Sequence, residues 1–370
     1  MSQPSILFMI HCRENTGYAI EKLESIFSQS AIQAQFNEKN VLFSYPEVSS
    51  KSDNIFCINF ATSSDAPKLI EIIHKRNVRT ILAFDLPFPS WVCTTAKNHG
   101  VQKVISYWGA SMSSLNYGFK LALKKVEYLL LRNKSADLYI FESEAMRQTA
   151  TIGRGIPLKK TEVVHLGVDT DVYKPSSKDK QYARELFDIP QDRSIIFYSG
   201  HMEKRKGVEV LINCAIELTN QGFSKFHVVI CGNKNDEEIP YLKTLSSFPA
   251  AQERVTFGGY RKDLPELMRS CDVGVIASTG WDSFTMSSLE MLASGLPLIV
   301  SNLQGLKETT VVGETGDTFT PGNHTELSAK LIALFNDPIC HKRFSVNARK
   351  RALSQFSVHK QVMNISNHLV

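Results

Sequence analysis

The chain has 370 residues, of which 43% are hydrophobic and 21% charged, a composition that excludes a mainly disordered protein. At roughly 100–200 residues per domain, this length predicts two domains or one large one, with ample apolar material for a core. The net charge of +5, from 42 basic and 37 acidic residues, is too small for an obligate nucleic-acid binder but compatible with an anionic small molecule or surface as partner. The seven cysteines are dispersed and never spaced C-x-x-C, so neither a disulfide framework nor a zinc site is predicted.

Apolar runs bounded by turn residues alternate with segments of helical periodicity, which predicts the α/β class, with parallel sheets covered by helices. The first run, Ile6–Ile10, is far shorter than the ~20 residues that span a bilayer and lacks the flanks of a secretion signal, so the expected location is the cytoplasm. Further strands in the first half are expected at Val41–Ser44, Asn54–Phe60, Thr80–Phe84, Lys103–Tyr107, Leu138–Ser143 and Glu162–His165. Helices between them are expected at Tyr18–Gln29, Ala66–Arg76 and Met146–Ile152.

The segment from Gly118 to Lys134 is basic and amphipathic, with five basic side chains among leucine, valine and phenylalanine residues. We favour an ordinary surface helix whose apolar side lies in the core. The alternative is a helix that rests on an anionic membrane surface.

The polar stretch 167–178 contains a proline and separates this series from a second one, so the domain junction is expected at residues 172/173. The second series of expected strands is Ser194–Ser199, Phe226–Cys231, Arg254–Phe257, Val273–Ala277, Leu298–Ser301 and Gly316–Phe319. Residues 325–370 are expected to be helical. We therefore expect doubly wound domains over residues 1–172 and 173–345, with residues 346–370 packing back on the first.

The sequence of residues 277–297 predicts a loop after a strand and then a helix over 285–294. Gly295 and Pro297 mark the end of this helix. The first-turn amides are expected to be those of Phe284, Thr285 and Met286. Because such amides have no intrahelical acceptor and lie at the positive end of the helix dipole, they favour an anion such as a diphosphate. Glu290, one turn further, is within reach of sugar hydroxyls beside it. The alternative without a ligand is a helix capped by Asp282 or Ser283, with Glu290 solvated.

A second strand, over 195–199, runs out into a basic loop that two glycines bound. Lys206 and Arg205 are placed to hold phosphates, and Gly200 lets the backbone approach a ligand closely. The loop matches neither the P-loop nor the G-x-G-x-x-G pattern. Taken alone, it is also compatible with a solvated basic loop.

Together these segments resemble the retaining glycosyltransferases of family 4, which have the GT-B fold of two Rossmann-like domains facing a cleft. Asp282, Glu290 and Pro297 have the spacing of the family signature E-x7-E, usually E-G-F-G-x-x-x-x-E-A-x-A-x-G-x-P. The other matches, in chain order, are Ala136-Asp137, Ser143-Glu144, Gly167-Val168-Asp169, Gly200 with Lys206-Gly207, Ile230-Cys231-Gly232, Phe257–Tyr260 with Leu264-Pro265, Ser301 with Gly305 and Glu308, and Gly313–Gly316. The resemblance covers residues 135–350 well and the first 130 weakly.

The resemblance implies retaining transfer of a sugar from a nucleotide diphosphate donor, most commonly UDP-linked, to a glycan or lipid-linked sugar in polysaccharide or surface-glycan synthesis. It implies no metal and no other cofactor, no nucleic-acid partner, and a cytoplasmic location with peripheral contact at the inner face of the membrane. The implied catalytic residues are Asp282 at the donor sugar, Lys206 at the diphosphate and Glu290 at the ribose. The implied donor-binding residues are Gly200, His201, Arg205, Gly232, Tyr260, Arg261, Leu264, Phe284, Thr285 and Met286.

Two residues of the second domain depart from the family pattern. Asp282 replaces the first glutamate of the signature and has a shorter reach. His201 replaces an arginine and removes a bidentate phosphate ligand, for which Arg205 is the expected replacement.

In the first domain, Tyr107 or Trp108 stands where many members carry a histidine that faces the donor sugar, so the backbone role there is expected to pass to Gly109 or Ala110. Of the family's glycine-rich loop after the first strand only Gly17 is present. The residues expected to line the cleft are therefore Gly17, Trp108 and Gly109, whereas His11 is more simply a polar residue at a strand end.

Other readings stay open. Asp169-Thr170-Asp171 spells the D-x-D motif with which another glycosyltransferase fold holds a metal, but its place in the domain junction favours a linker turn. A nucleotide-sugar epimerase or hydrolase of the same fold would turn over the donor alone. A non-catalytic homologue would bind nucleotide sugar without forming product.

Overall fold

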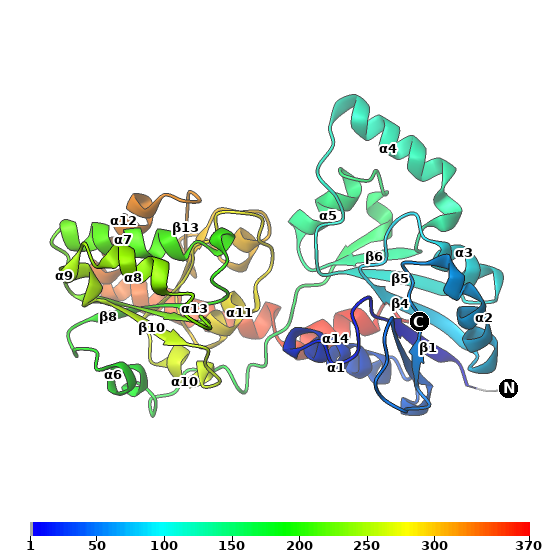
Figure 1. Cartoon of the computed structure of the whole chain (residues 1–370), viewed down its shortest axis with the longest axis horizontal. Coiled ribbons are helices and arrows are strands. Elements are labelled where there is room, and N and C mark those ends of the chain that lie inside the picture. Colours follow the sequence, from blue (N-terminus) through cyan, green and yellow to red (C-terminus); the bar gives the residue numbers. More distant parts are fainter. Residues whose placement is uncertain (1–2) are drawn as a thin grey trace. The chain divides into compact units, whose positions relative to one another are not determined.

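The computed structural model describes residues 3–370, which divide into two compact units (Figure 1). The first unit runs to His165 and adds Val358–Val370, and the second comprises Leu166–Ser357. Met1 and Ser2, which the predicted first domain includes, lie outside the described residues. The division falls before the predicted junction at 172/173 because Val168 is buried in the core of the second unit and donates its amide hydrogen to the carbonyl oxygen of Phe356, 2.7 Å away.

The first unit is built on one sheet of seven parallel strands in the order β3-β2-β1-β4-β5-β6-β7, and every predicted strand is present. The strands are β1 (Ser5–Met9), β2 (Val41–Tyr45), β3 (Ile55–Cys57), β4 (Val78–Phe84), β5 (Lys103–Trp108), β6 (Leu138–Phe141) and β7 (Thr161–Val163). The helices are α1 (Tyr18–Gln33), α2 (Ala66–Lys75), α3 (Trp91–Asn98), α4 (Gly118–Leu130), α5 (Glu144–Thr151) and α14 (Val358–Ser366). Alternate residues of β1 enter two different hydrophobic clusters, so the sheet is covered on both faces.

The C-terminal residues pack on the first unit, where α14 lies against α1. Gln361 Nε2 donates to the hydroxyl of Tyr107 at 3.2 Å, and Thr80 Oγ1 donates to the carbonyl oxygen of Leu369 at 3.1 Å. The prediction began this segment at residue 346. In the structure α13 (Pro338–Gln355) stays in the second unit and packs on α11 (Met286–Ala293), because its small residues Ala348 and Ala352 are buried there.

The second unit has a six-stranded parallel sheet in the order β10-β9-β8-β11-β12-β13. The strands are β8 (Ser194–Ser199), β9 (Phe226–Cys231), β10 (Val255–Gly259), β11 (Val273–Ile276), β12 (Leu298–Ser301) and β13 (Gly316–Phe319), close to the predicted limits. The remaining helices are α6 (Tyr182–Phe187), α7 (Val208–Asn220), α8 (Ile239–Leu245), α9 (Pro249–Gln252), α10 (Leu264–Arg269) and α12 (His324–Asn336). The prediction of two doubly wound α/β domains is confirmed.

The strand order of each sheet defines one topological switch point. The chain reverses its direction of strand addition between β1 and β4 in the first sheet and between β8 and β11 in the second. In open α/β sheets, ligands bind at the carboxyl ends of the strands at this switch point, because the two flanking loops diverge there. The loops after β8 and β11, which the sequence singles out, meet at the switch point of the second unit.

The favoured reading of segment 118–134 is wrong. Tyr128 is the one α4 side chain that is buried, whereas most of the apolar residues of this helix are exposed. No helix among the described residues is both long and apolar enough to cross a bilayer.

Candidate functional site

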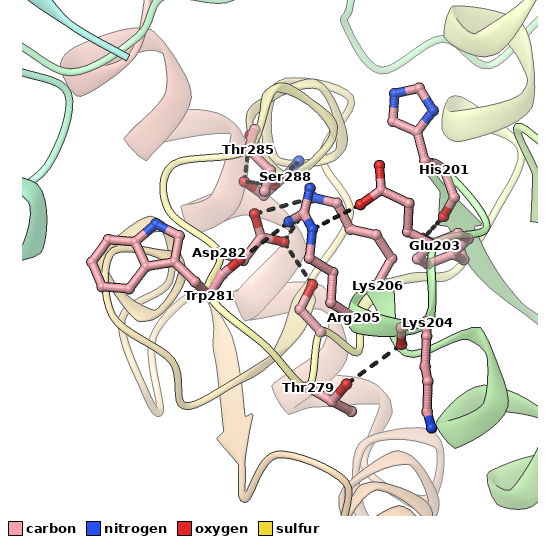
Figure 2. A network of polar contacts seen from close by, with 12 residues as sticks. His201, Glu203, Lys204, Arg205, Lys206, Thr279, Trp281, Asp282, Thr285 and Ser288 are labelled. Carbon is pink, nitrogen blue, oxygen red and sulfur yellow. Dashed lines mark hydrogen bonds and ion pairs between the residues drawn. The ribbon is translucent and has the colours of Figure 1, made fainter. Parts of the chain in front are cut away.

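An ion pair joins the two loops at the switch point of the second unit. Lys206 Nζ donates to both carboxylate oxygens of Asp282, at 3.1 and 2.9 Å (Figure 2). Ser278 Oγ donates to Oδ2 of the same carboxylate at 2.6 Å. The Lys206 and Asp282 side chains are 16% and 8% exposed, so this pair is shielded from water on most sides. The sequence singled out both residues but not the contact between them.

Backbone contacts bring these loops together. Lys206 ends a short 3₁₀ turn, η5 (Lys204–Lys206), and Gly207 follows with a φ of 73°. A Cβ atom on Gly207 would lie 1.8 Å from the carbonyl oxygen of Ala277, so the close approach requires glycine. The amide of Thr279 donates to the carbonyl oxygen of Arg205 at 2.8 Å. The backbone contacts thus fix the main chain at Lys206 against the loop after β11, and the ion pair with Asp282 positions its ammonium.

The other predicted residues of the basic loop lie around this pair. Arg205 donates from Nε to Oε2 of Glu203 at 2.7 Å (Figure 2). It also donates from Nη1 to the carbonyl oxygen of Trp281 at 3.1 Å. His201 is exposed. In this conformation Nε and Nη1 of Arg205 are engaged by an acid and a carbonyl, while its guanidinium carries further N–H donors.

The helix after β11 begins one residue later than predicted. Thr285 is its N-cap, and its Oγ1 accepts the amide hydrogen of Ser288 at 3.3 Å (Figure 2). Of the three predicted first-turn amides only that of Met286 lies inside the helix, whereas Phe284 precedes the cap and is buried against Phe356, with ring centroids 5.2 Å apart. The amides of Met286 and Ser287 occupy the first turn, where helix geometry provides no acceptor.

The structure contradicts the alternative without a ligand in both of its details. Neither Asp282 nor Ser283 is the N-cap, because Thr285 takes that position and the Asp282 carboxylate is turned to Lys206. Glu290 is not solvated but only 5% exposed. A buried acid on α11 and a shielded charge pair before it are features that a plain surface helix lacks.

The expected base-binding residues lie on the next loops at the same edge of the sheet. Gly232 follows β9 with a φ of 108°, and a Cβ atom there would lie 2.2 Å from the carbonyl oxygen of Gly200. Its amide donates to the carbonyl oxygen of Gly259 at 2.9 Å. These contacts join the loop after β9 to the loops after β8 and β10.

Residues 260–264 follow β10. Tyr260 is exposed, and Lys234 Nζ lies 5.0 Å from the centre of its ring. Arg261 pairs with Asp263, which accepts a hydrogen bond from the hydroxyl of Tyr182 at 2.6 Å. Leu264 begins α10 and packs on the hydrophobic core of the second unit. Each predicted donor-binding residue therefore lies in a loop or first turn that follows β8, β9, β10 or β11.

In the first unit the three predicted residues have different surroundings. Gly17 is the N-cap of α1, and the amide of Gly109 donates to Asp85 Oδ1 at 2.9 Å. The Trp108 side chain is buried in the hydrophobic core, where its indole nitrogen donates to Ser106 Oγ at 2.7 Å. Its ring is therefore used for packing, and only the backbone beyond it reaches the edge of the sheet.

Sequence reasoning missed two acids at the carboxyl edge of the first sheet. Asp85 follows β4 with a φ of 56°, and its Oδ2 lies 4.0 Å from Nδ1 of His11, which follows β1. Glu142 follows β6, is buried, and its Oε1 lies 3.4 Å from the hydroxyl of Tyr107. A sequence signal for both acids was available, because each directly follows an apolar strand. Asp85 follows β4, which lies next to the switch point, and Glu142 follows β6.

We expect Glu142 to make the first unit less stable as the pH rises. Burial, and secondarily the charge of Asp85, raises the pKa of this carboxyl to about 8 from its ordinary value of 4.5. Because the folded chain holds the proton more tightly than the unfolded chain, the stabilisation is complete below the ordinary pKa and is lost as the pH rises through the raised one. The thermal midpoint should fall between about pH 5 and about pH 8, and Glu142→Gln should reduce that fall by about 10 °C, because three pH units correspond to about 4 kcal/mol.

The matched control is Glu162→Gln, an exposed carboxyl on the neighbouring strand β7. The thermal midpoint of this variant should fall with rising pH as it does in the wild type. A Glu142→Gln variant whose midpoint falls as steeply as that of the wild type would show that this carboxyl does not carry the effect.

The Asp169-Thr170-Asp171 segment forms a turn. Asp169 Oδ1 accepts the amide hydrogens of Asp171 at 2.9 Å and Val172 at 3.1 Å. One of the oxygens that a metal would need is therefore used to hold the backbone, which agrees with a linker turn.

Residues 179–351 match the protein family described as glycosyl transferases group 1. The chain is 23% identical over 256 residues to the mannosylfructose-phosphate synthase of Agrobacterium fabrum, covering 67% of this chain and 55% of that one. It is 27% identical over 186 residues to the D-inositol 3-phosphate glycosyltransferase of Mycolicibacterium smegmatis, covering 49% and 41%. The chain spans about half the length of these curated relatives.

Solved structures resemble the whole chain. A glycosyltransferase from Rickettsia africae matches with a TM-score of 0.80 at 18% identity, covering 100% of this chain and 99% of that one. Anabaena HepE in complex with UDP matches with a TM-score of 0.74 at 20% identity, covering 99% of both chains. At these identities the likeness establishes the fold, which is the GT-B fold of two Rossmann-like domains.

Proposed function

We propose that this protein is a group 1 glycosyltransferase whose second unit binds a nucleotide diphosphate sugar at the carboxyl edge of its sheet. The observation that carries the proposal is the shielded Lys206–Asp282 pair at the switch point between β8 and β11, next to the start of α11. The match of residues 179–351 to the family supports it, since all of these residues lie within that range.

The chemistry of the pair suits a leaving diphosphate. When the bond between sugar and phosphate breaks, negative charge develops on the phosphate oxygens, and fixed cationic and dipolar groups stabilise it where it forms. Lys206 Nζ has three N–H groups and directs two of them to Asp282, which leaves one for a phosphate oxygen without breaking the pair. The amide of Met286, at the positive end of α11, adds a second donor.

We assign the remaining parts of the donor to residues in the other loops at this edge of the sheet. We assign Asp282 to the donor sugar, where its carboxylate accepts hydroxyl hydrogens and stays oriented by Ser278. We assign Glu290, which is buried one turn into α11, to the ribose. The backbone of Tyr260 and Arg261, after β10, is assigned to the base.

The finer points of the proposal are a retaining reaction, no requirement for a metal, and UDP as the nucleotide. The last is supported by HepE, which was solved with UDP. A glycan or lipid-linked sugar as acceptor, polysaccharide or surface-glycan synthesis as the setting and the cytoplasm as the location are also part of the proposal, on the resemblance alone.

A thermal-shift titration with UDP, GDP, ADP and UDP-sugars, with and without EDTA, tests the donor site. A nucleotide at about 100 times its dissociation constant should stabilise the second unit by about 2.7 kcal/mol. We expect a saturable shift with UDP that EDTA does not change. A shift that EDTA abolishes would contradict metal independence, and no shift with any nucleotide would contradict the donor site.

Product analysis separates the proposal from its alternatives. With an acceptor present, a transferase forms a product whose anomeric configuration, read by proton NMR, is that of the donor. Turnover of UDP-sugar at the same rate without any acceptor would indicate an epimerase or hydrolase instead. Saturable binding without product under either condition would indicate a binding protein.

A further inference from the structure

Two histidine rings of the first unit meet where helices α2 and α3 end. Nε2 of His74 lies 3.0 Å from Nδ1 of His99, and the planes of the two rings are nearly perpendicular, at 81° to each other. His74 is exposed and His99 is half-buried, and the contact between them is open to solvent. A hydrogen bond that water can replace contributes little to stability, and a ligand from solution can reach both nitrogens.

The helices fix the places of the two histidines. His74 lies in the last turn of α2, and His99 is the C-cap residue of α3. The two helices pack side by side on one hydrophobic cluster (Figure 1). The residues that anchor them in it are Leu69, Ile72 and Ile73 of α2 and Val92, Cys93 and Ala96 of α3. Because side chains on packed helices are positioned more precisely than those on loops, the core of the unit holds the two histidines at a defined separation.

The distance between the two ring nitrogens suits a divalent transition metal. Imidazole nitrogens bind such metals at about 2.0–2.1 Å, so two of them are about 2.8–3.0 Å apart when they form a right angle at the metal. At a tetrahedral angle they would be about 3.3–3.4 Å apart. The observed 3.0 Å falls in the first range. Right angles between ligands are typical of Ni²⁺ and Cu²⁺, whereas Zn²⁺ in structural sites is tetrahedral.

The charges around the pair are mixed. Both histidines lie at C-terminal ends of helices, where the helix dipole is negative and favours a cation. Glu71, which is exposed and precedes His74 by three residues, adds a negative charge on the neighbouring helix surface. Lys75 and Arg79 oppose a cation, and Nη1 of Arg79 donates to the carbonyl oxygen of the residue after His99 at 2.9 Å. Because exposed charges are screened by salt, the two imidazoles decide whether a metal binds.

We propose that His74 and His99 together bind one divalent transition metal ion, of the class of Ni²⁺ and Cu²⁺, through Nε2 and Nδ1. The metal takes the place of the hydrogen between these nitrogens, and each neutral ring then carries its proton on its other nitrogen. Among residues 3–370 no third histidine, cysteine or acidic side chain completes a metal-binding group, so water molecules fill the other coordination positions. The bound ion clamps the ends of α2 and α3 together.

The pair lies at the amino edge of the first sheet, because α2 and α3 lead into the first residues of β4 and β5. The switch point of this sheet is at the opposite, carboxyl edge. The inference therefore does not depend on the reaction proposed for the second unit, and it is compatible with a reaction that requires no metal.

Isothermal titration calorimetry with NiCl₂ tests the proposal on the full-length, tag-free protein, treated with EDTA and then desalted. We expect saturable binding of one Ni²⁺ per chain, tighter than the binding of Zn²⁺. His74→Gln and His99→Gln should each weaken Ni²⁺ binding by at least about tenfold, because loss of even a hydrogen-bond partner of a metal ligand costs about 10–100-fold. Ni²⁺ should also raise the thermal midpoint of the wild type but not that of either variant.

The matched control is His359→Gln, which removes an exposed histidine of α14 in the same unit and should bind Ni²⁺ as the wild type does. A cooperative thermal transition without metal verifies that each variant is folded, and an unchanged thermal shift with UDP separates the result from that of the donor site.

Three results would overturn the proposal. The wild type could show no saturable binding of Ni²⁺, or both variants could retain it. Binding that only one of the two variants loses would assign the ion to a single imidazole. Tighter binding of Zn²⁺ than of Ni²⁺ would contradict the right-angle geometry.

Discussion

The Lys206→Ala variant should lose turnover by at least about tenfold, equivalent to about 1.4 kcal/mol of transition-state stabilisation. Removing one preorganised donor from a developing anion typically costs about 10²–10³ in rate, and Lys206 is the cation that the two loops fix at the switch point. The effect should appear in kcat more than in KM, because the charge on the diphosphate develops as the bond breaks. Steady-state rates of donor consumption with acceptor measure it.

Lys204→Ala is the matched control, because Lys204 belongs to the same 3₁₀ turn and its ammonium points away from Asp282 (Figure 2). It should keep the wild-type rate. Lys206→Ala leaves the buried Asp282 carboxylate with Ser278 alone, so a loss of folding is the competing explanation. Lys206→Gln retains a donor for Asp282 but no charge, and a folded Lys206→Gln variant with wild-type turnover would exclude the proposed role.

The strands were predictable because parallel strands covered on both faces are continuous apolar runs with turn residues at their ends. Such runs as Phe226–Cys231 and Leu298–Ser301 appear in the structure with the predicted limits. The contact between Lys206 and Asp282 was not predictable in the same way. It depends on β8 lying beside β11, and strand order is a property of tertiary packing that local sequence does not carry.

Two further differences have local physical causes. Helix α11 begins at Met286 and not at the predicted Thr285, because the hydroxyl of Thr285 caps the helix. Aspartate is an equally good N-cap residue, but the carboxylate of Asp282 accepts from the ammonium of Lys206 instead. The predicted orientation of α4 was wrong because helical periodicity tells which residues share a face of the helix but not which face packs on the core. In α4 that choice is made by Tyr128 and by Gly155, which is distant in sequence.

Gly207→Ala should destabilise the second unit by about 3 kcal/mol or more. Part of the loss, about 1 kcal/mol, arises because a φ of 73° is unfavourable for any residue with a Cβ atom. The rest arises because that atom would lie 1.8 Å from the carbonyl oxygen of Ala277, and both partners are backbone. At about 2–4 °C per kcal/mol for a unit of this size, the thermal midpoint should fall by about 6–12 °C.

Gly222→Ala isolates the steric overlap, because Gly222 has nearly the same φ, 76°, and nothing lies within 4 Å of the position of its Cβ atom. This control should lose only the conformational part, about 1 kcal/mol. Equal midpoints for the two variants would mean that the loops after β8 and β11 separate easily and do not hold Lys206 in place. If the loops are held together as the geometry requires, Gly207→Ala should also weaken the shift that UDP produces, whereas Gly222→Ala should leave it unchanged, because only Gly207 directly follows Lys206.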